Sequence, residues 1–261
     1  MGKTKRRPSL LSKITFKVIR FFGRLFYKKT DIIGIERLSG RDIIIVANHA
    51  QLHGPIIGEL YMPEKIYTWA NGQMVRCREV PKYAMEDFFP YKSKAVRPIF
   101  KLASFCLAPL LPCVINNARA IPVYRDARIV STFRNTIRHL EMGHNILIFP
   151  ECHEKHNNIV NKFQENFVDL AKLYYRKTKK ALMFVPMYIA PELGATFVGE
   201  GTVFNSTENI AIERVRISSY LSEEITKMGR ELPEHTVVPF DNISKKLYPS
   251  NREIAGFEKM I

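Results

Sequence analysis

Cysteine is scarce in this sequence and follows no recognisable pattern. The chain has four cysteines in 261 residues, Cys77, Cys106, Cys113 and Cys152, and no two of them form a CxxC pair. Disulfide scaffolds of secreted proteins and structural zinc sites need closely spaced or paired cysteines. The spacing therefore favours reduced thiols in a cytosolic compartment.

Low-complexity segments and internal repeats are also missing, and so is a continuous apolar run followed by a small-residue cleavage site. We therefore expect no secretory signal. With 261 residues, 46% of them apolar, the chain is long enough for one large globular domain or two small ones. Because no Ser/Gly/Pro-rich linker divides it, we expect an N-terminal arm at residues 1–30 and one domain at residues 31–261.

Acidic residues are absent from the first thirty positions. Residues 1–30 hold ten Lys or Arg, which is two-thirds of the formal net charge of +15. A nucleic-acid-binding body would spread its basic residues across the fold. The basic-aromatic cluster "YYRKTKK" at residues 174–180 is more typical of the solvated end of a helix. We therefore expect no nucleic-acid partner.

The arm has helical periodicity over residues 10–29, with an apolar, phenylalanine-rich face and a basic flank on the opposite side. The apolar face consists of Leu11, Ile14, Val18, Phe21, Phe22 and Leu25, and the basic flank of Lys13, Lys17, Arg20, Arg24 and Lys28. Because a cation interrupts every turn, this helix is too polar to span a bilayer. The pattern favours a helix on an anionic membrane surface, and hence a peripheral protein on the cytoplasmic face of a membrane. The alternative is a helix packed on the domain with its basic edge in solvent.

Residues 31–261 alternate between short apolar runs and helical stretches. The runs predict strands at residues 41–49, 65–70, 119–125, 144–150 and 181–190, and the stretches predict helices at about 95–111, 129–142, 160–175 and 208–228. We expect Pro109 and Pro112 to break the first of these helices, which is also too short to span a membrane. The alternation predicts an α/β fold with a mixed, largely parallel sheet flanked by helices.

Polar side chains follow three of the predicted strands. His49, Arg125 and Glu151 each stand at or just past a strand end. In α/β sheets, ligands bind outside the carboxyl ends of the strands. We therefore expect these three side chains to converge on one site.

Four segments resemble a known family. They are "NHAQLHG" (48–54), "RAIPVYR" (119–125), "IFPE" (148–151) and "FVPMYI" (184–189). In order and approximate spacing, they are similar to the four motif blocks of the glycerolipid acyltransferases, which include the 1-acylglycerol-3-phosphate and other lysophospholipid acyltransferases. The resemblance covers about residues 43–190.

This resemblance implies transfer of a fatty acyl group from an acyl thioester, acyl-CoA or acyl carrier protein, to a hydroxyl of a lysophospholipid. It implies that His49 is the general base, that Arg125 binds the acceptor phosphate and that Glu151 helps to order the acceptor site. Asn48 and Lys155 are further candidates for substrate binding. The residue set calls for no metal and no cofactor beyond the thioester co-substrate.

The sequence departs from the family pattern at three places, and one of them is Arg119 in the second block, where the family commonly has Gly. The position of the Asp that orients the base holds Gly54, so the His-x4-Asp motif is degenerate; Glu59, Glu86, Asp87 and Glu154 are possible replacements for that acid. After Glu151 the family usually continues Gly-Thr-Arg, whereas this chain has residues 152–154, "CHE". The alternative function is therefore an impaired acyltransferase-fold protein that binds lipid or a partner at the membrane.

Each candidate residue also has a purely structural interpretation. His49 could simply end a strand, Arg125 could pair with Asp126, and Glu151 could cap the next segment or pair with a lysine. The remaining His and Cys near these blocks, His53, Cys152, His153 and His156, are expected to be loop or surface residues. His49 and His53 have the i, i+4 spacing of a helical zinc pair, but Ala50 stands where a zincin would have Glu.

Overall fold

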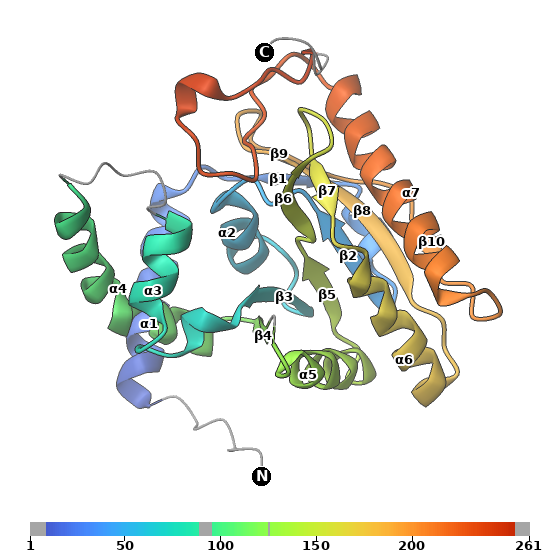
Figure 1. Ribbon diagram of the computed structural model, residues 1–261, viewed down its shortest axis with the longest axis horizontal. Coiled ribbons are helices and arrows are strands. Elements are labelled where there is room, and N and C mark those ends of the chain that lie inside the picture. The colour runs from blue at the N-terminus through green and yellow to red at the C-terminus, as the bar shows by residue number, and fades with distance from the viewer. Residues whose placement is uncertain (1–8, 89–95, 125, 254–261) are drawn as a thin grey trace. The chain divides into compact units, whose positions relative to one another are not determined.

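The computed structural model describes residues 9–88, 96–124 and 126–253 (Figure 1), and these divide into two compact units. The larger unit comprises residues 29–68 and 133–261, and the smaller one residues 1–28 and 69–132. This differs from the predicted division into an arm at 1–30 and a domain at 31–261, because residues 69–132 group with the arm. Each unit is described by itself below.

The larger unit is built on a mixed, largely parallel sheet, which confirms the predicted fold class. Its strands lie in the order β1, β9, β8, β2, β5, β3. Their bounds are β1 (Asp31–Ile33), β9 (Ala195–Val198), β8 (Met183–Ala190), β2 (Ile43–Ala47), β5 (Asn145–Ile148) and β3 (Ile66–Asn71). All these neighbouring strands pair in parallel except β8 and β9, which are antiparallel. The short strand β10 (Thr202–Val203) also pairs antiparallel with β8.

Strand β2 lies at the centre of this sheet because its residues are apolar without interruption. Every residue from Ile43 to Ala47 is buried. Its Ile45 is in register with Leu147 of β5 on one side and with Val185 of β8 on the other. A strand covered on both faces has no solvent side, so it needs no polar alternation. The carboxyl ends of β2, β5 and β8 therefore lie along one edge of the sheet.

Helices flank the sheet. They are α2 (His53–Leu60), α5 (Ile129–Glu141, whose first turn belongs to the smaller unit), α6 (Asp169–Thr178) and α7 (Ile210–Glu231). Helix α7 packs against β8 (Figure 1). It does so through Ile217, Leu221 and Ile225, which are buried and spaced one turn apart. Short 3₁₀ turns at Ile35–Leu38, Glu165–Val168 and Lys245–Leu247 complete this unit.

The predicted helix at residues 160–175 begins too early. Residues Asn161–Phe163 form strand β7, which pairs antiparallel with β6 (Glu151–Lys155), and helix α6 starts only at Asp169. The backbone N–H of Asn161 donates to the buried Glu151 carboxylate, 2.8 Å away. This contact comes from a residue ten positions earlier, and helical periodicity carries no trace of it.

The smaller unit is mainly helical. It contains α1 (Leu10–Phe26), α3 (Val80–Tyr83), α4 (Arg97–Asn117) and β4 (Ala120–Val123), with a 3₁₀ turn at Gly72–Val75 and a π turn at Ala84–Phe88. Helix α4 runs without interruption through Pro109 and Pro112, so the predicted break was wrong. Each proline removes a backbone hydrogen bond and crowds the carbonyl four residues earlier, but α4 packs against both α1 and α3. That packing sustains the helix across the missing bonds.

Helix α1 packs through a face that the sequence did not single out. Phe16 is its one buried residue. On the same side, the Ser12 hydroxyl contacts the Cys113 sulfur at 3.4 Å and accepts a hydrogen bond from Asn117 Nδ2 at 2.7 Å. The predicted apolar face is instead exposed, with Phe21 63% and Leu25 62% accessible. The helix therefore has three faces: one packed, one apolar and open, and one basic.

Helix α4 also leaves apolar side chains open. Ile99, Leu102 and Phe105 are all more than half exposed. Among the helices that the structure describes, α4 alone is long and apolar enough to cross a membrane, by length and composition. The prediction that it is too short was therefore wrong, because the helix continues past the two prolines.

Candidate active site at the carboxyl edge of the sheet

The chain leaves β2 through a loop with unusual backbone geometry. Ala50 and Gln51, directly after His49, both have positive φ, 45° and 52°. Residues with a Cβ rarely adopt this conformation, and it costs about 1–2 kcal/mol for each residue. Helix α2 begins only at His53, so His49 and His53 do not share a helix face. The helical zinc pair is thereby excluded.

Asn48 fastens this loop to the neighbouring strand. Its side chain is buried, and its amide makes two hydrogen bonds with Ile189 of β8. Asn48 Nδ2 donates to the Ile189 carbonyl at 3.1 Å, and Asn48 Oδ1 accepts from the Ile189 N–H at 2.7 Å. This side chain holds the strand end in place, and a substrate contact by Asn48 stays a prediction.

Glu151 joins the first and third motif blocks. Its carboxylate is buried and accepts hydrogen bonds from the His49 N–H at 2.5 Å and from the Asn161 N–H at 2.8 Å. Burial raises the pKa of Glu151 to about 7, against the opposing effect of these two N–H donors; the charge of Asp241 raises it further. Glu151 therefore ties the loop after β2 to strand β7, rather than capping the segment that directly follows it.

The His49 ring lies among aromatic side chains. It makes edge contacts with Phe149 at 5.1 Å and with Phe240 at 5.6 Å between ring centroids. Phe149 also explains Gly54. A Cβ at position 54 would lie 2.5 Å from the His49 carbonyl oxygen and 2.7 Å from Phe149 Cε1. The space in which the family's orienting acid would begin is therefore filled.

The acids that the sequence offered as replacements have other positions. Glu154 pairs with Lys162 at 2.9 Å, and both are largely exposed. Glu86 belongs to the smaller unit and lies 3.8 Å from Lys82. Glu59 lies in α2, and the side chain of Asp87 falls outside the described residues.

A carboxylate that strand-end placement did not point to contacts the ring of His153, two residues beyond the third motif block. His153, in β6, has its Nδ1 2.7 Å from Asp241 Oδ1. Asp241 lies 88 residues away, beyond α7, in a segment without regular secondary structure. A lone Asp in such a segment carries no motif, so spacing could not have found this pair. His153 is exposed, as predicted, but it is not a solitary surface residue.

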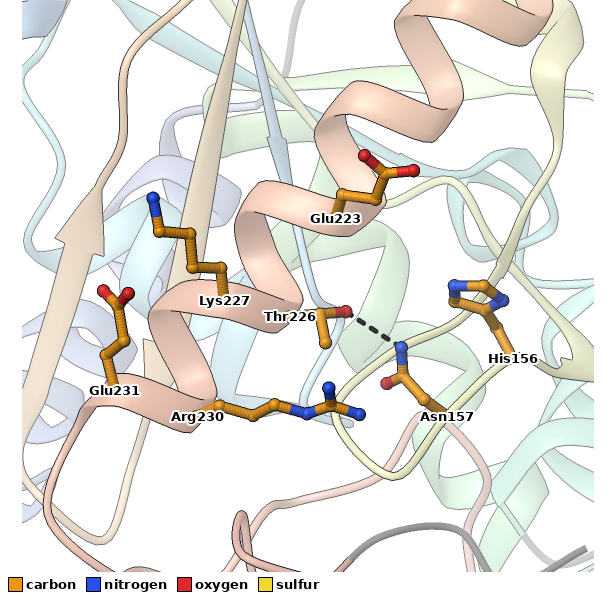
Figure 2. A pocket seen from close by; sticks show the side chains of 7 residues that line it. All are labelled: His156, Asn157, Glu223, Thr226, Lys227, Arg230 and Glu231. Carbon is orange, nitrogen blue, oxygen red and sulfur yellow. Dashed lines mark hydrogen bonds between the residues drawn. The ribbon is translucent and has the colours of Figure 1, made fainter.

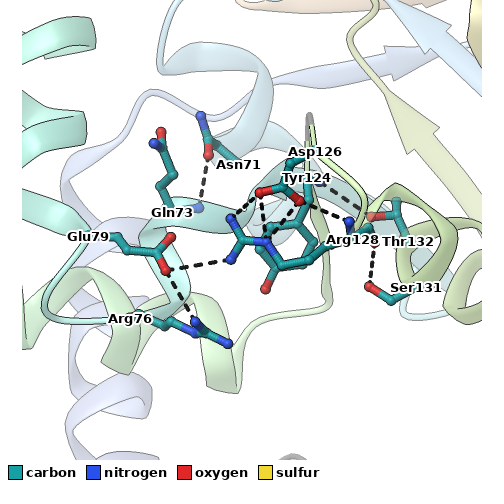
Figure 3. Close-up of polar contacts among 9 residues, drawn as sticks. All are labelled: Asn71, Gln73, Arg76, Glu79, Tyr124, Asp126, Arg128, Ser131 and Thr132. Atoms are coloured by element: carbon teal, nitrogen blue, oxygen red, sulfur yellow. Dashed lines mark hydrogen bonds and ion pairs between the residues drawn. The ribbon is translucent and has the colours of Figure 1, made fainter. Parts of the chain in front are cut away.

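Lys155 and Arg125 are the two remaining predicted site residues, and the structure describes only the first. Lys155 ends β6 and is exposed. Arg125 lies outside the described residues. Asp126 binds Arg128 through hydrogen bonds that include two from the guanidinium, of 2.9 and 2.7 Å (Figure 3), and its suggested pairing with Arg125 stays a prediction. These bonds lower the pKa of Asp126 to about 2.

Arg128 organises the surroundings of that strand end within the smaller unit. Its guanidinium lies 4.2 Å from the centroid of the Tyr124 ring and 3.5 Å from the carboxylate of Glu79 (Figure 3). Glu79 in turn pairs with Arg76 at 3.3 Å. Asp126 and Glu79 are thus both engaged with Arg128.

A hollow lies between α7 and the segment after β6. It is lined by His156, Asn157, Glu223, Thr226, Lys227, Arg230 and Glu231 (Figure 2). Asn157 Nδ2 donates to Thr226 Oγ1 across it, at 2.9 Å. Four of the seven lining residues are charged, which does not suit a fatty acyl chain. Within the described ranges, no three His, Cys, Asp or Glu side chains are grouped as a metal site would require.

Comparison with solved structures finds matches for this chain. No protein-family profile and no curated protein matches the chain. The chain is similar to the crystal structure of the 1-acyl-sn-glycerophosphate (LPA) acyltransferase PlsC from Thermotoga maritima. The identity is 16%, the match covers 83% of this chain and 81% of that one, and the TM-score is 0.42. With a likeness of this size, the case for a function depends on the residues of the site.

Proposed function

We propose that this protein is an acyltransferase that moves a fatty acyl group from an acyl thioester to a hydroxyl of a lysophospholipid-type acceptor. The observation that carries the proposal is the contact between the first and third motif blocks. His49 and Glu151, 102 residues apart, meet at the carboxyl edge of β2 and β5, and are joined by the hydrogen bond of 2.5 Å. This is the edge at which α/β folds bind ligands.

The reaction needs one proton acceptor at this edge. As the acceptor hydroxyl forms its new C–O bond with the thioester carbonyl carbon, an imidazole removes the hydroxyl proton. The C–S bond then breaks, and the departing thiolate takes that proton from the imidazolium. Products are an ester and a free thiol. The family resemblance predicts His49 for this role by motif position, and the donor would be acyl-CoA or an acyl-carrier-protein thioester.

The acceptor contacts are proposed from charge. Arg125 and Lys155 are the candidate partners of an acceptor phosphate, because guanidinium and ammonium groups bind phosphate oxygens. Glu154 stands where the family usually has Arg and carries the opposite charge, although Lys162 offsets it. Acceptors whose phosphate is esterified to a headgroup, with less negative charge than a phosphate monoester, therefore fit better than lysophosphatidic acid.

The membrane contact is proposed from the smaller unit. Phe21 and Leu25 of α1, and Leu102 of α4, are exposed apolar side chains. The basic flank of α1 complements anionic lipid headgroups. Helix α4 has protein packed along one side, at α1 and α3, which favours a helix lying in the interface over one crossing the bilayer. We propose peripheral binding to an anionic, cytoplasmic membrane face.

Vesicle sedimentation tests this membrane contact. We expect binding to phosphatidylglycerol-containing vesicles that weakens with salt, and much weaker binding to pure phosphatidylcholine. Lys17→Gln and Arg24→Gln should each weaken binding about fivefold, because one cation near such a surface contributes about 1 kcal/mol. Lys172→Gln, an exposed cation of α6, is the matched control. Equal binding to both lipid compositions would contradict the proposal.

A second candidate function is a lipid-binding or partner-binding protein that has lost catalysis. The observation favouring it is the filled space at Gly54, where Phe149 stands in place of the acid's side chain. In hydrolase triads, removing the orienting acid costs about four orders of magnitude in rate.

Acyl transfer itself is the deciding measurement. Wild-type protein is supplied with a long-chain acyl-CoA and, in parallel, with lysophosphatidic acid, lysophosphatidylglycerol, lysophosphatidylethanolamine and lysophosphatidylcholine. We expect ester formation with at least one acceptor, and loss of it in the double variant His49→Ala/His153→Gln. No transfer to any acceptor, from acyl-CoA or from acyl carrier protein, would favour the second candidate.

A further inference from the structure

A histidine–carboxylate pair that belongs to no motif begins two residues beyond the third motif block. His153 Nδ1 and Asp241 Oδ1 are 2.7 Å apart, the distance of a charge-assisted hydrogen bond. The His153 side chain is 73% exposed, whereas the Asp241 side chain is only 20% exposed. The carboxylate is thus held within the protein surface, and the imidazole extends from it into solvent.

Asp241 is fixed on several sides. Asn161 Nδ2 donates to Asp241 Oδ2 at 3.4 Å, and Gln51 Nε2 donates to the Asp241 backbone carbonyl at 3.0 Å. Gln51 is itself held by the Tyr248 hydroxyl, which donates to Gln51 Oε1 at 2.9 Å. Gln51 belongs to the first motif block and has one of the two left-handed backbones after His49. The strained loop therefore orients Asp241.

The pair also lies at the site already described. The Glu151 carboxylate accepts hydrogen bonds from the Asn161 N–H and from the His49 N–H. It therefore connects strand β7 with the loop that follows β2. The Phe240 ring makes edge contacts with both imidazoles, at 5.6 Å for His49 and 5.1 Å for His153. The two histidines thus flank one phenyl ring at the carboxyl edge of the sheet.

We propose that His153, oriented by Asp241, is the general base of this site. A base needs a carboxylate that fixes its ring and stabilises the imidazolium, and a second nitrogen that can reach the substrate. Asp241 provides that carboxylate at Nδ1. The exposure of the His153 ring leaves Nε2 open to a substrate. In the first block, position 54 has no side chain that could serve in this way.

The inference rests on the proposed acyl transfer and names its proton acceptor. His153 Nε2 takes the proton of the acceptor hydroxyl while the oxygen bonds to the thioester carbon. The same nitrogen returns the proton to the thiolate once the C–S bond has broken. His153 is the catalytic residue in this scheme, and Asp241 is a positioning residue.

Single substitutions with matched controls test the assignment. We expect His153→Gln to lower acyl transfer at least 100-fold and Asp241→Asn at least tenfold, with thermal midpoints unchanged for the exposed His153. His156→Gln removes an exposed histidine three residues further on and should leave the rate unaltered. His49→Gln should reduce the rate less than His153→Gln. Full activity in His153→Gln, with loss in His49→Gln, would overturn the assignment and make His49 the base.

Nitrogen-15 NMR of the imidazole measures the tautomer of His153. This tautomer would not depend on Asp241 if Asp241 had only a structural role. In wild type the proton of neutral His153 should reside on Nδ1, and Asp241→Asn should shift the tautomer equilibrium towards Nε2–H. An unchanged tautomer in Asp241→Asn would overturn the orienting role. A wild-type protein that is inactive with every acceptor would reject the proposed function itself. An active wild type together with a fully active His153→Gln would reject only the assignment of His153 as the base.

Discussion

The two units of this protein use apolar residues in opposite ways. In the larger unit, strand β2 is apolar from Ile43 to Ala47 and every one of these side chains is buried. In the smaller unit, α1 is as apolar along one face, and that face is open. Two apolar sequence patterns, one in β2 and one in α1, therefore lie in different environments, the first buried and the second exposed. Periodicity identifies an apolar face, and only the three-dimensional partner decides whether that face is core or surface.

Helix α1 contains both environments, so the effect of burial can be tested within one helix. Phe16 is buried and Phe21 is 63% exposed on the same helix. We expect Phe16→Ala to lower the free energy of unfolding by about 3 kcal/mol, because it opens a cavity. Phe21→Ala should change it by less than about 0.5 kcal/mol. Urea denaturation followed by circular dichroism measures both, and equal losses would mean that the open face is packed in solution.

The larger unit should respond to pH through the buried carboxylate of Glu151. The pKa of Glu151 is raised from 4.5 to about 7, so the folded protein binds its proton more tightly than the unfolded chain does. Its contribution to stability is fully present below about pH 4.5 and falls as pH rises towards 7. The shift corresponds to about 3 kcal/mol.

Glu151→Gln isolates that effect, because the amide does not titrate. The difference in unfolding free energy between wild type and variant should favour wild type most at low pH and should shrink by about pH 7. Thermal midpoints across pH 4–8 provide the measurement. A difference that is constant with pH would show that Glu151 ionises normally in the folded protein.

Gly54 tests how tightly the site is packed. We expect Gly54→Ala to cost about 2 kcal/mol, because the new Cβ would meet the His49 carbonyl oxygen and the Phe149 ring. Gly40→Ala is the matched control, since its Cβ would meet only the end of the Ile43 side chain, at 3.3 Å. Comparable stability of both variants would show that the His49 carbonyl and the Phe149 ring both move aside.

The smallest expected effect concerns the packed face of α1. Ser12→Ala removes the hydroxyl that accepts from Asn117 Nδ2 and contacts Cys113. We expect a loss of about 1 kcal/mol, the usual net value of one such hydrogen bond. Ser131→Ala, whose exposed hydroxyl donates to the Arg128 carbonyl, provides a reference for a local hydrogen bond.

The sequence was informative where a local pattern determines the structure. The five predicted strands correspond to β2, β3, β4, β5 and β8, and the arm helix to α1. The α/β architecture follows from that alternation. Strands β6 and β7 were missed because residues such as His153 and Lys155 are polar, and the pairing of β6 with β7 is stabilised by a buried carboxylate. Helix α4 was predicted too short because proline rules weigh local hydrogen bonds and ignore packing.

The site was predictable only in part, for the same reason. Strand-end placement predicted that the side chains of His49 and Glu151 would converge; the structure shows the Glu151 carboxylate bound to the His49 backbone N–H. Neither the Phe149 ring beside Gly54 nor the pairing of His153 with Asp241 could be inferred, because each depends on side chains brought together from distant segments. Arg125 lies outside the described residues, so its convergence on the site stays a prediction.

The left-handed pair Ala50–Gln51 has a consequence for how this chain tolerates sequence change. Glycine at either position would relieve backbone strain of about 1 kcal/mol. At position 51 it would also remove the amide that holds Asp241. Stabilisation and activity therefore favour different residues at this one position. A library selected for heat resistance alone should enrich glycine at 51, and selection for acyl transfer should retain glutamine.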